Sequence, residues 1–468
     1  MRQDLVLTHA YRLAEDVHER RYMKPYPPLG LLSLAPYLKR DGFGVDVVDC
    51  TFDSRARHLD RLARCDAPVL GIYANLMTRG AALDLIRVGR AWGRWIVMGG
   101  PDPAENAAEY LAAGASVVVH GEGERTLAEL LPALDRAGTQ DLASIAGLSF
   151  LDADGRCFRT PPRPNLGNLG DLPWPDREAI DLAPYLDCWR RHHGRSSLNL
   201  VTARGCAWRC RWCSHAVFGH RHARRPAADV ADEVAWLHDR FRPDQLWYAD
   251  DVFTASTRWL RDFAAEMRAR QLRLPFECIT RADRVDDEVA RLLAELGCYR
   301  VWLGAESGSQ RILDAMERGI TLAQLRRAAD ALRRQEIAVG MFVMWGYPGE
   351  TRSDIEATVA EVARIRPDRC LSTVAYPIRG TPYHAEVADR IVALKPWQAG
   401  SDRDHAIRGR RSKRYYAAAS RLLQARLALA VARRPSEGGI RWRAASGALW
   451  GIARARLAMR LRAWEREA

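Results

Sequence analysis

The chain has 468 residues, of which 48% are apolar and 28% charged, as expected for a globular protein with two or three domains. It contains no apolar run long enough to span a bilayer, and its first residues lack the pattern of a secretory signal. Ten cysteines without such a signal favour a reducing compartment, where thiols more often bind metals or take part in catalysis. We therefore expect a cytoplasmic protein.

The formal net charge of +13 is concentrated at one end of the chain. Residues 403–468 hold 17 Lys and Arg against 4 Asp and Glu, a surplus of 13 that equals that of the whole chain. Two helical patterns in this tail, 415–434 and 444–464, place apolar residues among arginines: Leu449, Trp450, Ile452, Leu457 and Leu461. The tail fits either a helix packed on its own protein or peripheral contact with a membrane surface. We do not expect a nucleic-acid partner, because no recognised binding module accompanies the charge.

Short apolar strands alternate with helical patterns over residues 1–140. The expected strands are 5–8, 45–49, 69–73, 95–99 and 117–120, and the expected helices are 31–39, 55–64, 81–91, 104–112 and 124–134. This alternation predicts a doubly wound, Rossmann-like α/β domain whose ligands bind at the carboxyl ends of the strands. Residues 141–195 follow as a small hairpin and a Pro-rich linker.

Six further strand–helix units predict a partial (βα)6 barrel of the TIM type over residues 196–388. Its expected strands are 198–202, 245–248, 276–280, 300–303, 339–344 and 371–375. In such barrels the functional residues lie in the loops at the carboxyl ends of the strands. A basic α-helical extension, 389–468, completes the expected domain order.

Three cysteines follow the first barrel strand in the order C-x3-C-x2-C: Cys206, Cys210 and Cys213. Closely spaced thiolates hold iron–sulfur clusters, and a cubane [4Fe–4S] cluster normally takes four of them. The nearest other cysteines, Cys188 and Cys278, lie far outside the loop. The pattern therefore indicates a cluster with one iron open to an exogenous ligand. A zinc site or three unrelated thiols are the alternatives.

This spacing resembles the signature of the radical S-adenosylmethionine (SAM) enzymes, and Trp212 before the last cysteine fits it too. The resemblance covers roughly residues 196–385 and includes motifs after later strands. It implies that the following residues bind SAM: Asp250, Asp251, Arg281, Glu306 and Ser307. Taken singly, the two aspartates and the arginine equally suit helix caps or surface ion pairs.

Residues 1–140 resemble the cobalamin-binding domain that precedes many radical SAM enzymes. The resemblance depends on turns at the strand ends, and it implies these cofactor-binding residues: Pro28, Gly30, Gly99, Gly100, Gly121, Glu122 and Gly123. No D-x-H-x-x-G string occurs, so the resemblance implies cobalamin bound without a protein histidine on cobalt. A nucleotide-type domain, or a degenerate one that binds nothing, is the alternative.

Together the resemblances imply an enzyme that cleaves SAM reductively at a [4Fe–4S] cluster to a 5′-deoxyadenosyl radical, with flavodoxin or ferredoxin as electron donor. The implied reaction is methylation of an unactivated carbon in a small molecule or a natural-product or lipid intermediate. The alternative is an oxidative cyclisation or ring rearrangement, as in the anaerobic magnesium-protoporphyrin monomethyl ester cyclase. A tRNA methylthiotransferase is disfavoured, because only Cys50 and Cys65 precede Cys157.

Overall fold

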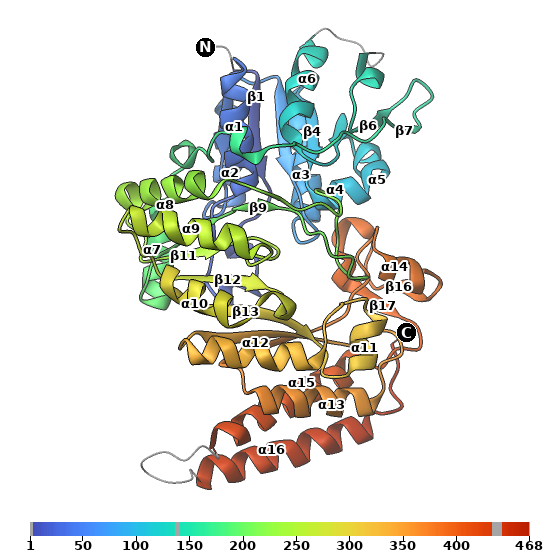
Figure 1. Ribbon diagram of the computed structural model, residues 1–468. Helices are drawn as coiled ribbons and strands as arrows, with labels where there is room; N and C mark the ends of the chain where they lie inside the picture. Colours follow the sequence, from blue (N-terminus) through green and yellow to red (C-terminus); the bar gives the residue numbers. More distant parts are fainter. Residues whose placement is uncertain (1–2, 136–140, 433–441, 468) are drawn as a thin grey trace. The chain divides into compact units, whose positions relative to one another are not determined.

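The computed structural model describes residues 3–135, 141–432 and 442–467 (Figure 1). These residues form two compact units. The first unit comprises Met1–Ala207, Ser214–Ala249 and Lys395–Ser401, and the second comprises Trp208–Cys213, Asp250–Leu394 and Asp402–Ala468.

The first unit contains a seven-stranded sheet in the order β2-β1-β3-β4-β5-β6-β7. Strands β1 to β5 run parallel to one another and confirm the five predicted strands: Leu5–His9, Val45–Val48, Val69–Tyr73, Trp95–Gly99 and Val117–Val119. The order 2-1-3-4-5 is that of a doubly wound fold, whose switch point lies between β1 and β3. The ends of β1 and β3 are therefore where a ligand is expected.

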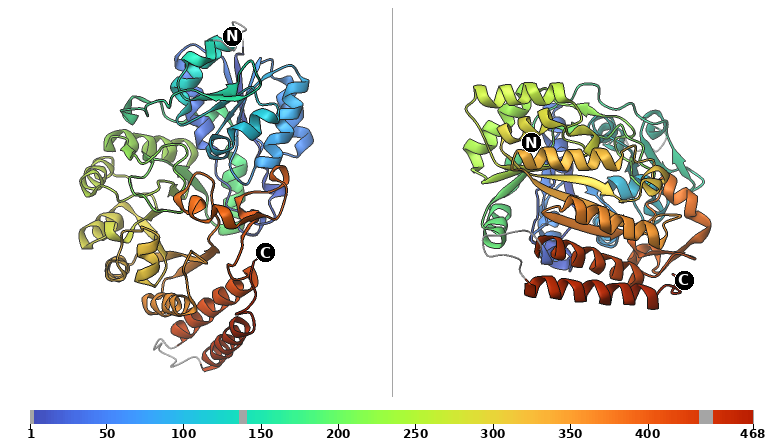
Figure 2. Two further views of the ribbon diagram at one scale, coloured as in Figure 1. Left: turned by 90° about the vertical axis from the view of Figure 1, so that its right-hand side faces the viewer. Right: turned by 60° about the horizontal axis from the view of Figure 1, so that its bottom comes forward.

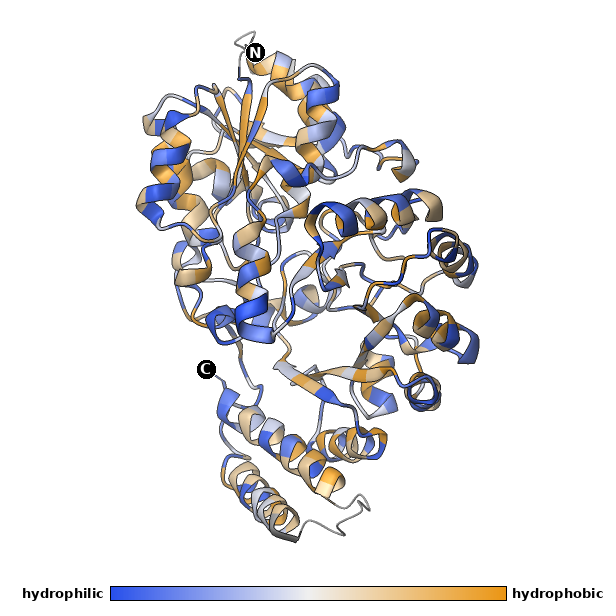
Figure 3. Cartoon of the chain, turned by 90° about the vertical axis from the view of Figure 1, so that its left-hand side faces the viewer, coloured by the Kyte–Doolittle hydropathy of each residue, from blue (hydrophilic) through white to orange (hydrophobic). Residues whose placement is uncertain are grey.

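Helices cover both faces of this sheet (Figure 2, left). They are α1 (Leu29–Arg40), α2 (Arg55–Arg64), α3 (Arg79–Ala91), α4 (Pro101–Glu105), α5 (Ala107–Ala112) and α6 (Gly123–Asp135). Alternate residues of β1 enter different cores: Leu5 and Leu7 pack with α1 and α6, and Val6 packs with α2 and α3. Burial on both faces explains why the strands are almost wholly apolar (Figure 3). The single helix predicted over 104–112 is divided at Asn106 into α4 and α5.

The predicted hairpin does not stand apart from the N-terminal sheet. Strands β6 (Leu148–Leu151) and β7 (Cys157–Arg159) pair antiparallel with each other, and β6 pairs antiparallel with β5. The hairpin, which we placed with the linker in the segment 141–195, therefore extends the sheet. Helix α7 (Ala183–His193) follows, and two-residue strands β9 (Ala203–Arg204) and β10 (Ala223–Arg224) pair on either side of the cysteine loop.

Six barrel-type strands follow in chain order, as predicted. In the first unit β8 (Ser197–Leu200) is parallel to β11 (Gln245–Tyr248). In the second unit four strands pair in parallel in chain order: β12 (Phe276–Thr280), β13 (Cys298–Glu306), β14 (Ala338–Trp345) and β15 (Arg369–Val374). The helices between them are α8 (Ala227–Phe241), α9 (Thr257–Ala269), α10 (Asp287–Leu296), α11 (Gln310–Ala315), α12 (Leu322–Arg334) and α13 (Arg352–Ile365).

Local signals set several of these helix ends. The Asp286 side chain accepts from the amide of Val289 at the start of α10, and Gly297 ends that helix in the left-handed conformation, at φ +96°. Helix α12 begins with a capping box formed by Thr321 and Gln324. These caps fix both ends of α10 and the start of α12.

The C-terminal part of the second unit holds a helical hairpin. Helix α14 (Pro382–Val387) and strands β16 (Ile391–Ala393) and β17 (His405–Ile407) lead into α15 (Lys413–Ala432) and α16 (Trp442–Leu461). Helix α15 contacts α13 on one side and α16 on the other. Both predicted tail helices are confirmed, although residues 433–434 lie outside the described part of the chain. Among the described residues, no helix is both long and apolar enough to cross a bilayer.

Gly308 shows how tightly the loop after β13 packs on α13. A Cβ at this position would lie 2.5 Å from the Cα of Thr358 and 2.8 Å from the Cβ of Glu361. Since the first neighbour is backbone, Gly308→Ala should lower the free energy of unfolding by about 1–3 kcal/mol in urea denaturation. Gly167→Ala is the control, because a Cβ there meets no atom within 4 Å. Equal stability of the two variants would contradict this packing.

Candidate active site

The cysteine loop begins directly after β9. Cys210 is buried, Cys206 is partly buried and Cys213 is exposed; none of the chain's ten cysteines, all of them described, forms a disulfide. The amide of Cys213 donates to the carbonyl oxygen of Cys210 at 3.1 Å, so these two residues share a tight turn. Among the described residues, no three His, Cys, Asp or Glu side chains already converge as a metal-binding group. Ligation by all three cysteines therefore stays a prediction.

The two tryptophans of the loop each face a buried or half-buried arginine of the second unit. The guanidinium of Arg281 lies 4.7 Å from the ring centre of Trp208, and that of Arg284 lies 5.2 Å from it. The guanidinium of Arg318 lies 5.9 Å from the ring centre of Trp212. Cation–π attraction therefore holds residues 208–213 to these arginines at two places within the second unit.

Both buried arginines also approach the sulfur of Cys210. Nη1 of Arg318 lies 3.4 Å from Sγ, and Nη1 of Arg281 lies 3.9 Å from it. Arg281 is only 1% exposed and Arg318 only 8%. Such donors stabilise a thiolate or the negative charge of a thiolate-ligated cluster.

Other contacts hold the two guanidinium groups in place. Arg281 bonds to the carboxylate of Asp283 at 2.8 Å, and it donates to the carbonyl oxygen of Arg318 at 2.8 Å. Arg318 donates through Nη2 to the carbonyl oxygen of Gly304 at 3.1 Å. Burial lowers the pKa of Arg318, but the charges of Glu306 and Cys210 outweigh it and raise that pKa overall. Burial and the positive charge of Arg318 lower the pKa of Arg281. Because an arginine side chain keeps its proton in proteins, both groups are cations.

Glu306 ends β13 in an unusual backbone conformation. Its φ is +58°, in the left-handed region that non-glycine residues rarely adopt, and the pairing of β13 with β14 shifts between Gly304 and Glu306. The carboxylate lies 4.0 Å from Nε of Arg318. Burial raises the pKa of Glu306, whereas Arg318 and Arg281 oppose that rise. Backbone strain of this kind concentrates at functional sites.

Gly304 makes room for this arrangement. A Cβ there would lie 2.5 Å from Nη2 of Arg318 and 2.6 Å from Oε1 of Glu306. A side chain at position 304 would therefore displace one of the two charged groups.

The other predicted SAM residues differ in their surroundings. The hydroxyl of Ser307 lies 3.1 Å from that of Thr358 on α13 and accepts from the amide of Ser309. Ser307 is therefore engaged with α13. Asp250, which is 2% exposed, and Asp251 follow β11. Burial and the neighbouring charge of Asp250 raise the pKa of Asp251.

The glycines predicted to approach cobalamin lie at strand ends of the first unit. Gly100 has φ +105°, and a Cβ there would lie 2.4 Å from the carbonyl oxygen of Ala74, so this position requires glycine to join the ends of β3 and β4. A Cβ at Gly30 or Gly99 would meet no atom within 4 Å. Three predicted residues remain: Pro28 caps α1, Gly121 has φ +75° after β5, and Gly123 begins α6.

The Glu122 side chain, which we predicted to bind the cofactor, makes contacts within the protein. One carboxylate oxygen bonds to Arg204 at 2.8 Å, and the other accepts from the amide of Leu166 at 2.6 Å. Arg204 also bonds to Glu124 at 2.6 Å. The carboxylate of Glu122 is thus committed to protein contacts, and it ties the loop after β5 to the strand that precedes Cys206.

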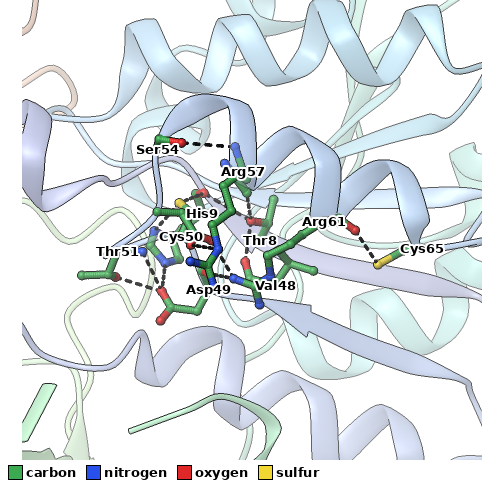
Figure 4. A network of polar contacts seen from close by, with 12 residues as sticks. Thr8, His9, Val48, Asp49, Cys50, Thr51, Ser54, Arg57, Arg61 and Cys65 are labelled. Carbon is green, nitrogen blue, oxygen red and sulfur yellow. Dashed lines mark hydrogen bonds and ion pairs between the residues drawn. The ribbon is translucent and has the colours of Figure 1, made fainter. Parts of the chain in front are cut away.

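A polar network at the ends of β1 and β2 was not predicted (Figure 4). Nε2 of His9 lies 2.7 Å from Asp49, and the amide of Tyr11 donates to Nδ1 of His9 at 3.1 Å. The Tyr185 hydroxyl lies 2.9 Å from Oδ2 of Asp49 and 2.7 Å from Oγ1 of Thr51. Both ring nitrogens of His9 are therefore engaged within this network.

Two family models match the chain. The model described as the Radical SAM superfamily covers residues 200–362, and the B12 binding domain covers residues 21–131. The chain is a radical SAM enzyme with a cobalamin-binding domain. Its cofactors are accordingly a [4Fe–4S] cluster, SAM and cobalamin.

Named relatives are similar to this radical SAM enzyme over most of its length. An uncharacterized methyltransferase of Pyrococcus horikoshii, PH0819, is 28% identical over 80% of this chain and 81% of its own. The anaerobic magnesium-protoporphyrin IX monomethyl ester cyclase of Synechocystis is 26% identical over 78% of this chain and 74% of its own. The structure of TsrM, a radical SAM methyltransferase of Kitasatospora setae with cobalamin and a [4Fe–4S] cluster bound, covers 86% of this chain and 81% of its own, with a TM-score of 0.69 and 22% identity. The last similarity confirms the fold.

The donor set fits a thiolate-bound cluster. Three reduced cysteines lie in one loop, and the sulfur of Cys210 faces two buried cations. The sequence analysis predicted the cysteines and Arg281 as site residues but did not single out Arg318. Its position before Gly319, in a turn after a short helix, carries no pattern that distinguishes it from a surface arginine.

Replacing Arg318 should make the reconstituted cluster harder to reduce. Arg318→Gln removes a cation that donates to Cys210, so we expect the midpoint potential to fall by roughly 60 mV, equivalent to about 1.4 kcal/mol for one electron. The measurement is a redox titration followed by electron paramagnetic resonance. Arg284→Gln is the matched control, because it removes a nearby charge that is 45% exposed. Equal potentials in the two variants would show that the contact with Cys210 does not tune the cluster.

Proposed function

We propose that this enzyme is a cobalamin-dependent methyltransferase that methylates an unactivated carbon of a small molecule or of a natural-product or lipid intermediate. The observation that carries the proposal is the group formed by Cys210, Arg281, Arg318 and Glu306, in a chain that also has a cobalamin-binding domain. Similarity over four-fifths of the chain to a protein named as a methyltransferase supports it.

The proposed domain boundaries are 1–140 for cobalamin binding, 141–195 for the hairpin and linker, 196–388 for the barrel and 389–468 for the basic extension. Strands β6 and β7 extend the N-terminal sheet. This pairing favours a first domain boundary after residue 159.

In the proposed site, the three cysteines of the loop hold the cluster. Arg318 and Arg281 balance its charge at Cys210, and they orient the loop through Trp212 and Trp208. Glu306 offers a buried carboxylate for the ribose hydroxyls or the ammonium group of SAM, and Asp250 and Asp251 offer further acceptors. Ser307 acts indirectly, by fixing the loop to α13.

When bound, the reduced cluster supplies the electron that cleaves SAM, and methylcobalamin supplies the methyl group. The protein contributes binding, orientation and exclusion of water. Gly99 and Gly30 leave open space for close approach of the corrinoid, and Gly100 and Gly121 shape the turns beside it. Burial of Arg281 and of the backbone around Glu306 keeps water from the reacting groups.

We also propose a cytoplasmic location and an electron donor of the flavodoxin or ferredoxin type, because reductive cleavage of SAM consumes an electron. In addition, we propose that the basic C-terminal extension makes peripheral contact with a membrane.

A second candidate is radical cyclisation or ring rearrangement without net methyl transfer. The observation that favours it is the similarity to the magnesium-protoporphyrin ester cyclase over 78% of this chain.

Replacing any cysteine of the loop should abolish SAM cleavage. In Cys206→Ala, Cys210→Ala and Cys213→Ala, we expect release of 5′-deoxyadenosine to fall to background and bound iron to fall with it, because a cluster ligand is lost. Cys157→Ala, which changes an exposed thiol of β7, serves as the control and should retain both. Reductive cleavage retained in a loop variant would refute the assignment of that cysteine.

The products formed from SAM distinguish the two candidate functions. Methylation should yield both S-adenosylhomocysteine and 5′-deoxyadenosine, because one SAM reloads the cobalamin and another supplies the radical. Cyclisation should yield 5′-deoxyadenosine alone. Chromatography of anaerobic reactions with the substrate measures both compounds. A product mixture without S-adenosylhomocysteine would exclude methyl transfer by this route.

A further inference from the structure

Helix α16 has a packed face and a bare face. Its packed face is formed by residues that are at most 7% exposed: Ala445, Ala448, Ile452, Ala455 and Met459. These small side chains let the helix pack closely on α15, and a Cβ at Gly451 would lie only 3.2 Å from the Cβ of Ala425. Figure 2 (right) shows the two helices side by side. Only one face of α16 is therefore buried against the rest of the protein.

The bare face carries large apolar side chains where a surface helix normally has polar ones. We call Trp450, Leu457, Leu461 and Trp464 the outer stripe; they are 67%, 57%, 71% and 86% exposed. At about 100° per residue, the stripe lies on the side of the helix opposite Ile452 and Met459. Trp464 continues it just beyond the last helical residue. Single exposed apolar residues are common, but a continuous stripe with two tryptophans indicates an interaction surface.

The charge beside the outer stripe is positive. Arg454, Arg456 and Arg460 are exposed, and the guanidinium of Arg454 lies 5.6 Å from the ring centre of Trp450. Neither α15 nor α16 contains an Asp or Glu. The two acids that follow α16 are already engaged: Glu465 accepts from Ser412 at 2.8 Å, and Glu467 bonds to Arg410 at 2.7 Å.

We propose that the outer stripe docks the enzyme on an anionic lipid bilayer, with α16 lying in the plane of the interface. Tryptophans favour the boundary between headgroups and acyl chains, leucines enter it, and flanking arginines reach the anionic headgroups. The helix is not apolar enough to cross the bilayer, so it remains at the surface. A second copy of this chain is a poorer occupant, because a two-fold contact would bring the arginines of both copies together.

This inference rests on the membrane contact proposed above for the C-terminal extension and assigns it to the outer stripe; it does not depend on the proposed reaction. The test uses the purified full-length protein in flotation with vesicles of phosphatidylcholine, alone or mixed with phosphatidylglycerol. We expect the protein to float with the mixed vesicles and to lose at least about tenfold in affinity in Trp450→Ser/Leu457→Ser, because two apolar anchors are removed. The triple variant Arg454→Gln/Arg456→Gln/Arg460→Gln should lose the preference for phosphatidylglycerol.

Val431→Ser is the matched control, because Val431 is 58% exposed on α15 and outside the outer stripe. All variants change exposed side chains, and unchanged circular dichroism and 5′-deoxyadenosine release should confirm that fold and chemistry are intact. Failure of the wild type to float, or equal flotation of wild type and double variant, would overturn the proposal. So would a concentration-dependent dimer that the double variant abolishes without any vesicle binding, since it would identify a second copy as the occupant.

Discussion

Two guanidinium groups buried beside one cysteine sulfur constrain much of the second unit. A buried cation is tolerated only where acceptors surround it, and an unpaired one costs several kcal/mol. The acceptors for Arg281 and Arg318 come from Asp283, the carbonyl oxygen of Gly304 and the sulfur of Cys210. These charged contacts join the ends of β12 and β13 and the turn after α11 to the cysteine loop, in addition to the packing of Trp212 on the apolar cluster that includes Ile312 and Met316. Such a network also keeps its members rigid, because no side chain can leave without stranding another.

The bulge at the end of β13 follows from the same requirement. The left-handed conformation of Glu306 directs its carboxylate toward Arg318, and the absence of a side chain at Gly304 leaves space for both. Backbone strain at Glu306 is offset by the ion pair and by the packing of Gly308 on α13. In the proposed site, the Glu306 carboxylate is already in place before SAM binds, which reduces the reorganisation that binding would otherwise require.

The sequence predicted the scaffold better than the uses of individual side chains. Strands such as β3 and β12 were predicted to the residue, because buried parallel strands form short apolar runs between turn residues. The cysteine loop was recognisable because its chemistry needs three thiols at close spacing. Glu122, in contrast, was assigned to a cofactor from its place at a strand end, but its carboxylate bonds to Arg204. Arg318 was missed for the same reason: pairing between distant charges leaves no periodic signal in the sequence.

The short strand before the cysteines has a consequence for exchange of domains between related enzymes. With only two residues, β9 is positioned largely by the bonds from Arg204 to Glu122 and Glu124, which belong to the cobalamin-binding part of the chain. A chimera that joins the N-terminal domain of one relative to the barrel of another would separate the two sides of this contact. Unless both parent proteins carried the same residues at the positions of Arg204, Glu122 and Glu124, the chimera would leave a buried charge unpaired next to the cysteine loop. The two domains are therefore expected to be inherited and to change together, although each has its own cofactor.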